Sequence, residues 1–220
     1  MDRRATVGAV CLVLMVAVPG CTRSEPRPAP PSTSAAPTAA RTGTPTPPVN
    51  TPTAAGPSEN YRSYTTKCDW MWPGGGAACT VTHQNPVPPL SGVTSIAAGQ
   101  HSGFNRLTFV FTHAVPTYDV RFVRELLDGG RGVPVPLENT GGVVQICFDG
   151  AQANAVTSQP PPKVALSRIV SFAKGEDFEG VVRYGIGLAG PVGADERVKV
   201  RVAEGQRADG AFVVVVDVEG

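Results

Sequence analysis

The chain has little of the charge that marks a protein for nucleic acid or for an anionic membrane. Only 17% of its 220 residues are charged, and 19 basic against 18 acidic side chains leave a net charge of +1. Nucleic acids and anionic lipids are bound through clustered basic charge, which this composition does not supply. We therefore expect no nucleic-acid partner.

Motifs of enzymes and metal sites are also absent from the sequence. It has no Gly-x-Ser-x-Gly, no His-Glu-x-x-His, no phosphate-binding loop and no Cys-x-x-Cys. His83, His101 and His113 stand apart without an i, i+4 or His-x-His pair, so they predict no metal site. We interpret Asp177 and Glu179 as part of a solvated acidic turn. The pattern favours a protein that is not an enzyme and has no cofactor, and a triad assembled only in space stays open.

The first 20 residues are organised as an export signal. Arg3 and Arg4 precede an uncharged, mostly apolar run over residues 5–18, which is too short for an ordinary membrane span. The run ends in Val-Pro-Gly-Cys at residues 18–21, which resembles the bacterial lipobox. This predicts a lipoprotein signal peptide over residues 1–20 and lipid attachment at Cys21, which would hold the protein on the outer face of the cytoplasmic membrane. A secretion signal with an incidental Cys21 is the alternative.

Residues 21–58 have the composition of a linker. Pro, Thr, Ser and Ala fill 29 of the 37 positions in residues 22–58, and Val49 is the only larger aliphatic residue there. Such a segment cannot bury enough apolar area to offset its ordering entropy, so we expect a disordered spacer. The composition fits an O-glycosylated stalk and an unmodified linker equally well.

The remaining residues have the hydrophobic alternation of β-strands. Leu107, Phe109 and Phe111, for example, fall on one strand face, and Phe212 to Val216 suits a strand buried on both faces. Strands are expected at residues 93–97, 106–111, 118–123, 143–148, 164–172, 181–188, 198–202 and 211–218, with one helical turn at residues 124–128. This predicts an all-β fold, an antiparallel β-sandwich of about 7–8 strands or a barrel, over residues 93–220. Residues 59–92 would form an N-terminal extension rich in Cys and Trp.

That extension contains Cys68 and Cys79, which enclose Trp70, Trp72 and three consecutive glycines. An exported protein meets oxidising conditions, so a Cys68–Cys79 disulfide is expected. The tryptophans, held on a loop before the first strand, would form a stacking surface for sugars or for a partner's apolar groups, or would cover one end of the sandwich. Cys147 is expected to be a buried, inert thiol, and an intermolecular disulfide is the alternative.

Several motifs in the predicted domain resemble those of a known family. His-Ser-Gly-Phe-Asn-Arg at residues 101–106 leads into a strand, and Pro-Thr-Tyr-Asp-Val-Arg-Phe-Val follows at residues 116–123. Phe-Glu-Gly at residues 178–180, Tyr-Gly-Ile-Gly-Leu at residues 184–188 and a terminal Val-Asp-Val come later. Their order and spacing resemble the AMIN-like domain of actinobacterial lipoproteins.

The resemblance implies a β-sandwich related to AMIN domains, which in cell-wall amidases are non-catalytic and direct the enzyme to peptidoglycan. The expected function is that of a membrane-anchored, non-enzymatic envelope lipoprotein that binds peptidoglycan or a wall-associated component. A protein-interaction module for an envelope complex and a carrier of an apolar small molecule are the alternatives. The candidate binding residues are His101 and Arg106, which suit the carboxylates and carbonyls of a muropeptide, together with Trp70, Trp72 and Tyr184. The same motifs also make sense as turn and core residues.

Overall fold

A computed structural model describes residues 60–84 and 90–220, all of which lie in the unit from Pro48 to Gly220. The predicted signal peptide, Cys21 and the predicted linker lie outside the described residues. The described residues form strands, turns and loops without a helix. The strands are β1 (Tyr61–Met71), β2 (Cys79–Val81), β3 (Ser91–His101), β4 (Phe104–Phe111), β5 (Thr117–Val123), β6 (Leu126–Leu127), β7 (Pro134–Val135), β8 (Gly142–Asp149), β9 (Ala151–Gln152), β10 (Ile169–Phe178), β11 (Val181–Leu188), β12 (Val200–Arg207) and β13 (Phe212–Glu219).

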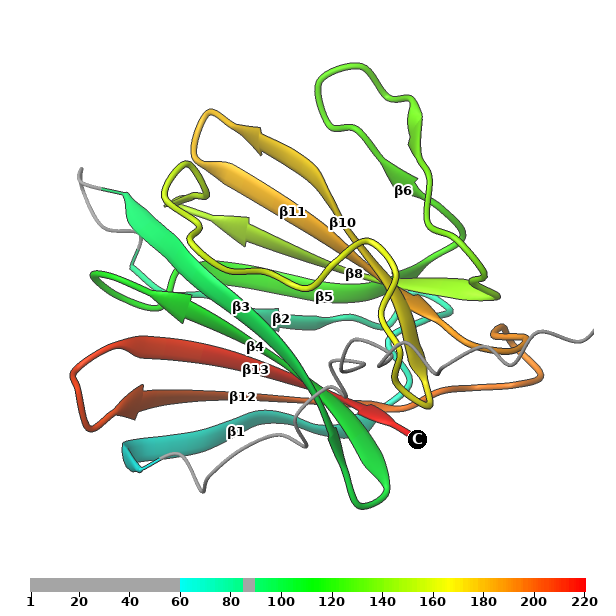
Figure 1. The fold of residues 1–220 in the computed structure, drawn as a ribbon, viewed down its shortest axis with the longest axis horizontal. Helices are drawn as coiled ribbons and strands as arrows, with labels where there is room; N and C mark the ends of the chain where they lie inside the picture. The colour runs from blue at the N-terminus through cyan, green and yellow to red at the C-terminus, as the bar shows by residue number, and fades with distance from the viewer. Residues whose placement is uncertain (1–59, 85–89) are drawn as a thin grey trace, which may run out of the picture. The chain divides into compact units, whose positions relative to one another are not determined.

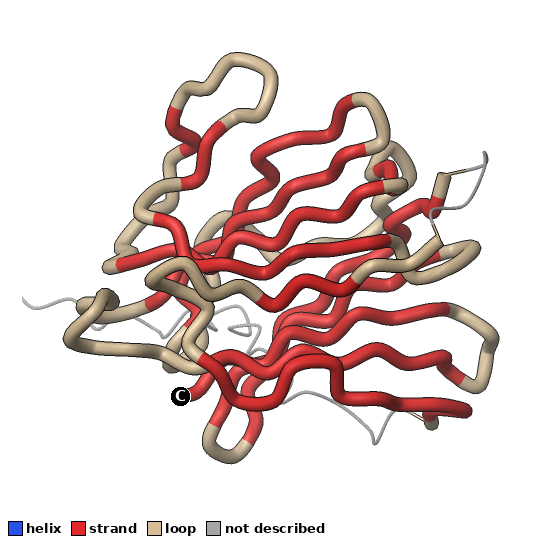
Figure 2. The backbone as a smooth tube through the Cα atoms, turned by 180° about the vertical axis from the view of Figure 1, so that it is seen from behind, coloured by secondary structure: helices blue, strands red, loops and turns tan. Residues whose placement is uncertain are grey.

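The strands form two sheets that pack against each other, as Figures 1 and 2 show from opposite sides. One sheet has six strands in the order β1-β12-β13-β4-β3-β9, and the other has five in the order β10-β11-β8-β5-β2. Neighbouring strands in them pair antiparallel, apart from the short parallel pair of β3 and β9. The predicted all-β antiparallel sandwich is therefore confirmed. Strands β6 and β7 form a separate hairpin.

Aromatic rings from both sheets fill the space between them. The Phe109 ring of β4 lies 5.2 Å from Phe148 of β8 and 5.5 Å from Tyr184 of β11, measured between centroids. Phe172 of β10 stacks on Tyr184 at 5.3 Å, and both side chains belong to the buried core. Such contacts add to the burial of apolar area and fix the sheets against each other.

Strand β13 is buried on both faces, as its run of valines predicts. Val214, Val216 and Val218 point into the core between the sheets. Val213 and Val215 form a second buried cluster with Val110 on the other face of the six-stranded sheet. The outer face of the six-stranded sheet thus includes a buried apolar cluster.

Two local predictions are wrong. The predicted helical turn at residues 124–128 is instead β6, because Leu126 is buried against Gly175 and Gly185 and pairs with Val135 of β7. The strand predicted at residues 164–172 begins only at Ile169, because the N–H of Val164 bonds back to the carbonyl of Val170 and the chain turns there.

The segment predicted as an N-terminal extension contributes a strand to each main sheet. Strand β1 pairs with β12 at the edge of the six-stranded sheet, and β2 pairs with β5 at the edge of the five-stranded sheet. Trp70 therefore lies within β1 and not on a loop before the first strand. The predicted Cys68–Cys79 disulfide is confirmed, with 6.0 Å between the Cα atoms. It ties the edges of the two sheets together.

Candidate functional site

A row of charges crosses the outer face of the six-stranded sheet. Arg201 of β12, Asp217 of β13 and Arg106 of β4 lie opposite one another in register. Asp217 is 1% exposed and accepts hydrogen bonds from Arg106 Nε at 2.7 Å and from Arg201 Nη2 at 2.6 Å. A buried carboxylate is tolerated when charged donors satisfy it in this way. It offsets one of the two positive charges.

Aromatic rings lie over this row. The Phe104 ring is 5.3 Å from the Arg106 guanidinium and 5.4 Å from that of Arg201, and the Arg201 guanidinium also lies 4.8 Å from the Trp70 ring. His101 stacks on Phe104 at 4.8 Å with an interplanar angle of 3°. These distances are those of cation–π and stacking contacts, so each group fixes the next.

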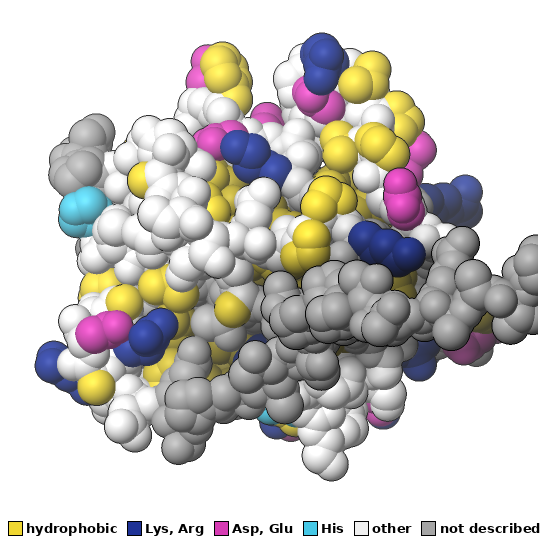
Figure 3. All heavy atoms as spheres, viewed as in Figure 1, with side chains coloured by type: hydrophobic (Ala, Val, Ile, Leu, Met, Phe, Trp, Pro, Cys, Tyr) yellow, Lys and Arg dark blue, Asp and Glu magenta, His cyan; other side chains and the backbone are white. Residues whose placement is uncertain are grey.

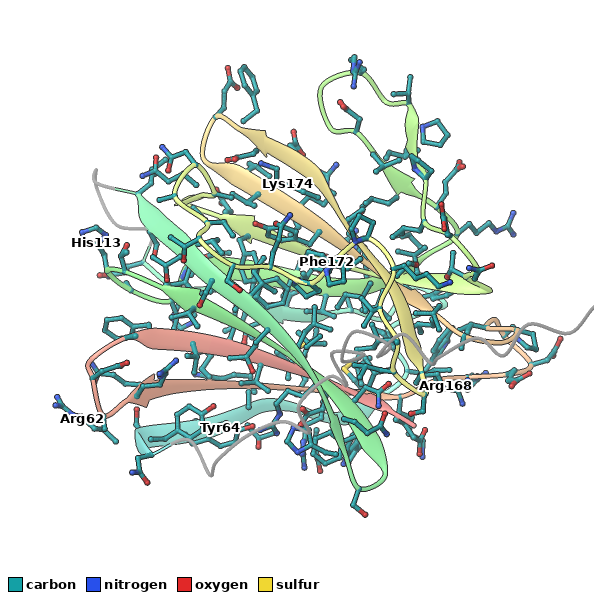
Figure 4. All side chains as sticks on the ribbon, in the orientation of Figure 1. Arg62, Tyr64, His113, Arg168, Phe172 and Lys174 are labelled. Atoms are coloured by element: carbon teal, nitrogen blue, oxygen red, sulfur yellow. A yellow bond between two sulfur atoms is a disulfide. The ribbon has the colours of Figure 1, made fainter. Side chains whose placement is uncertain are left out.

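Tyr64 of β1 extends the group toward the edge of the sheet, where Figure 4 labels it. Its hydroxyl accepts a 3.5 Å hydrogen bond from Arg106. We call the whole set the outer-face platform. It comprises Tyr64, Trp70, His101, Phe104, Arg106, Arg201 and Asp217.

A β-bulge in β1 is what places Trp70 on this face. Cys68 pairs with Val202 and Met71 with Val200, so two residues of β1 oppose the single Arg201 between them. The extra residue reverses the alternation, which keeps Cys68 and Met71 against the core while Trp70 turns outward onto Arg201.

The β3–β4 hairpin that carries His101 and Phe104 is anchored from below. Gly103 has a φ of 83°, a left-handed turn conformation that glycine adopts without strain. Buried Asn105 accepts hydrogen bonds from the N–H groups of Arg168 and Ile169 at 2.7 and 2.9 Å. The side chains of the platform thus stand on a fixed turn and on paired strands, which is the preorganisation that recognition requires.

The platform has the chemistry of a polar stacking site. Arg106 and Arg201 keep 20% and 27% of their side chains exposed. The two N–H groups on Nη1 of Arg201 bond to none of the described residues, so they can donate to a carbonyl or carboxylate of a ligand. The rings of Trp70 and Phe104 offer apolar faces beside these donors.

Three of the five predicted binding residues, Trp70, His101 and Arg106, therefore meet on one face. Tyr184 does not join them, because it is fully buried in the core, where burial and the charge of Asp177 raise the pKa of its phenol. Trp72 lies elsewhere, with its ring 4.8 Å from Phe122 of β5.

The sequence does not single out Arg201 or Tyr64 as binding residues, and it contains Phe104 and Asp217 only as parts of the family-like motifs. The one available signal was Asp217 itself. A single carboxylate inside a run of buried valines needs a charged partner, but the sequence does not say which of 19 basic residues supplies it.

A second polar cluster lies around buried Glu204. Its carboxylate is 2.8 Å from His83 Nε2 and 3.1 Å from Lys67 Nζ, and burial together with its charge raises the pKa of Tyr118. No Ser, Thr or Cys side chain of the described residues bonds to the His83 ring. This cluster links β12 to β1 and to the loop after β2, and we interpret it as structural.

Other features of the described part bear on the predicted partners and reactivity. Residues 60–84 and 90–220 contain no group of three His, Cys, Asp or Glu side chains placed to hold a metal ion. The same residues contain no helix long and apolar enough to cross a membrane. Cys147 is a half-buried free thiol, and burial raises its pKa against the opposing effect of Arg183.

Large hydrophobic side chains are exposed mainly away from the platform. Phe178 is 63% exposed at the β10–β11 turn, and Val133 and Leu127 are 45% and 38% exposed in the β6–β7 hairpin. Figure 3 shows hydrophobic side chains beside charged ones at the tips of these hairpins.

Comparison with known families and proteins gives one match. The model of the AMIN-like domain family matches residues 91–220, which carry β3 to β13. No curated protein and no solved structure matches the chain.

Proposed function

The chain belongs to the AMIN-like domain family, a family of cell-wall-related binding modules, and from this premise we propose that it binds peptidoglycan through the outer-face platform. The observation that carries the proposal is the meeting of Trp70, His101 and Arg106 around one ring, Phe104. A glycan strand offers the apolar faces of sugar rings to such aromatics, and its stem peptides offer carbonyls and carboxylates to arginine.

The proposal includes a lipid anchor at Cys21 and no catalytic role. The lipobox-like residues 18–21 and the Pro/Thr-rich residues 22–58 support a tether to the outer face of the cytoplasmic membrane. The absence of nucleophile, phosphate-loop and metal motifs supports binding without chemistry. Cys21→Ala should release the exported chain from the membrane fraction, and retention of that variant there would contradict the anchor.

Co-sedimentation of the full chain with purified sacculi tests the binding proposal. We expect saturable pelleting that Arg201→Gln weakens by about tenfold, the usual effect of losing a hydrogen bond from a charged donor. Phe104→Ala should weaken it at least as much. Phe178→Ala is the control, since this side chain is 63% exposed and outside the platform.

Two results would overturn the assignment. If Arg201→Gln and Phe104→Ala pellet as well as the unchanged chain does, the platform is not the site that binds the wall. A chain that does not pellet at all would point to a protein partner, to be sought by crosslinking in intact cells. No observation favours an apolar carrier, because the rings of Phe109, Phe148 and Tyr184 fill the space between the sheets.

A further inference from the structure

A pocket of about 690 Å³ lies at the end of the sandwich where β5 ends and β8 begins. This is within the usual range of small-molecule sites, roughly 300–1,000 Å³. Its lining includes Trp72, Phe122, Arg124, Gly142, Val192 and Arg197. None of these residues belongs to the outer-face platform.

Two aromatic rings lie against bare backbone in this pocket. A Cβ on Gly74 would come within 2.4 Å of the Trp72 ring, and a Cβ on Gly142 would come within 2.5 Å of Phe122. The N–H of Phe122 donates to the carbonyl of Pro73, which holds the chain after Trp72 to β5. Glycines are thus required for the two rings to lie where they do.

The described pocket lining has two positive charges and no negative one, whereas in the platform Asp217 offsets one of two arginine charges. Arg124 and Arg197 are its only charged residues among the described lining, which contains no acidic side chain. Neither arginine makes an ion pair within residues 60–84 and 90–220, and Arg197 donates to the carbonyl of Ala194 at 3.1 Å. Two arginines beside an aromatic pair suit an anion that also has a flat apolar face.

We propose that this pocket is a second binding site, which takes a sugar ring bearing a carboxylate. The ring would lie on Trp72 and Phe122, and the carboxylate would accept hydrogen bonds from Arg124 and Arg197. The class is that of N-acetylmuramic acid without a stem peptide, because its lactyl carboxylate is free only when the peptide amide has been removed. The choice of a wall sugar rests on the proposed function, whereas the anionic, ring-bearing character follows from the pocket itself.

The chain has two tryptophans, which makes the test specific. In full-length Trp70→Phe, Trp72 is the sole tryptophan, and its fluorescence reports on this pocket. We expect N-acetylmuramic acid to change that fluorescence saturably. N-acetylglucosamine, which lacks the lactyl carboxylate, should bind at least about tenfold more weakly. In the Trp70→Phe background, Arg124→Gln combined with Arg197→Gln should remove this difference between the two sugars.

Equal responses to the two sugars, or a difference that survives the double arginine change, would overturn the proposal. Both arginines are exposed, so the variants should fold, and unchanged thermal unfolding verifies this. If the chain pellets with sacculi but Trp72 fluorescence does not respond, the pocket is not a binding site and the proposal for the platform stands. If Trp72 fluorescence responds but the chain does not pellet, the pocket is a binding site and the proposal for the platform is wrong.

Discussion

The two tryptophans are two residues apart in the sequence but lie in two different environments. Trp70 lies on a paired strand over Arg201, whose charge buried Asp217 satisfies. Trp72 follows the end of β1 and lines a pocket whose arginines, Arg124 and Arg197, have no carboxylate beside them in the described lining. One β-bulge thus places Trp70 and Trp72 on two different surfaces, a platform in which Asp217 offsets one of two arginines and a pocket whose described lining has two arginines and no carboxylate.

This difference has a consequence for binding. A platform in which Asp217 offsets one of two arginine charges contributes stacking and directed hydrogen bonds with a smaller net charge, so we expect salt to weaken its binding less. A pocket with unpaired arginines contributes net attraction, which falls as ionic strength rises. We therefore expect salt to weaken the Trp72 response to N-acetylmuramic acid more than it weakens pelleting through the platform.

The change with the largest expected effect removes the Asp217 carboxylate, the negative charge that the platform has and the pocket lining lacks. Asp217→Asn leaves Arg106 and Arg201 facing each other without a counter-ion, and we expect it to lower the free energy of unfolding by about 3 kcal/mol. Denaturant unfolding measures this. Asp209→Asn is the matched control, because Asp209 is 57% exposed and its pair with Arg207 should contribute under about 1 kcal/mol. Equal losses in the two variants would mean that Asp217 does not hold the platform.

The case of Asp217 also shows what the sequence could and could not predict. Alternation of Leu107, Phe109 and Phe111 gives the strand and its inward face directly, and the sandwich follows from many such strands. The pairing of β13 with β4 joins residues more than 100 positions apart, such as Arg106 and Asp217. No local pattern encodes that pairing.

Strand β1 was missed for a related reason. Six consecutive residues, 62–67, are exposed on this edge strand, so it lacks the apolar alternation on which the prediction depended. Its bulge between Cys68 and Met71 then reverses the side that alternation would assign to Trp70. The sequence therefore predicts the tryptophans and the disulfide beside them, but not that Trp70 and Trp72 lie on different surfaces.

Removing the disulfide should affect the two tryptophans unequally. Cys68→Ser with Cys79→Ser reopens a short loop and should lower the free energy of unfolding by about 2–3 kcal/mol. Trp70 keeps the pairing of β1 with β12, whereas Trp72 loses the covalent link that holds its loop near β5. We expect the Trp72 response to N-acetylmuramic acid to fall several-fold more than pelleting does. Cys147→Ser, which leaves the loop closed, is the control, and equal losses at both sites would contradict the comparison.

A single methyl group should alter the pocket without touching the platform. Gly142→Ala places a Cβ 2.5 Å from Phe122 and 2.8 Å from Val192, so the ring must move, at an expected cost of about 1–2 kcal/mol. Gly193→Ala lines the same pocket with nothing within 4 Å of its Cβ. Fluorescence titration of both variants should show a loss only for Gly142→Ala. If Gly142→Ala leaves the fluorescence response unchanged, the sugar ring does not lie on Phe122.

The smallest expected effect is on the pH dependence of stability and comes from Tyr184, which is buried and belongs to neither site. Burial raises its pKa, so above about pH 10 the unfolded chain gives up a proton that the folded chain keeps. Stability is then fully present below pH 10 and falls as the pH rises, by about 1 kcal/mol near pH 10.5 for this residue. Tyr184→Phe should remove that part of the decline in a series of denaturant midpoints. At pH 8 it should cost little, because the Tyr184 hydroxyl has no hydrogen-bond partner among the described residues. An unaltered decline in Tyr184→Phe would mean that the phenol reaches solvent, which would return Tyr184 to the set of accessible binding residues.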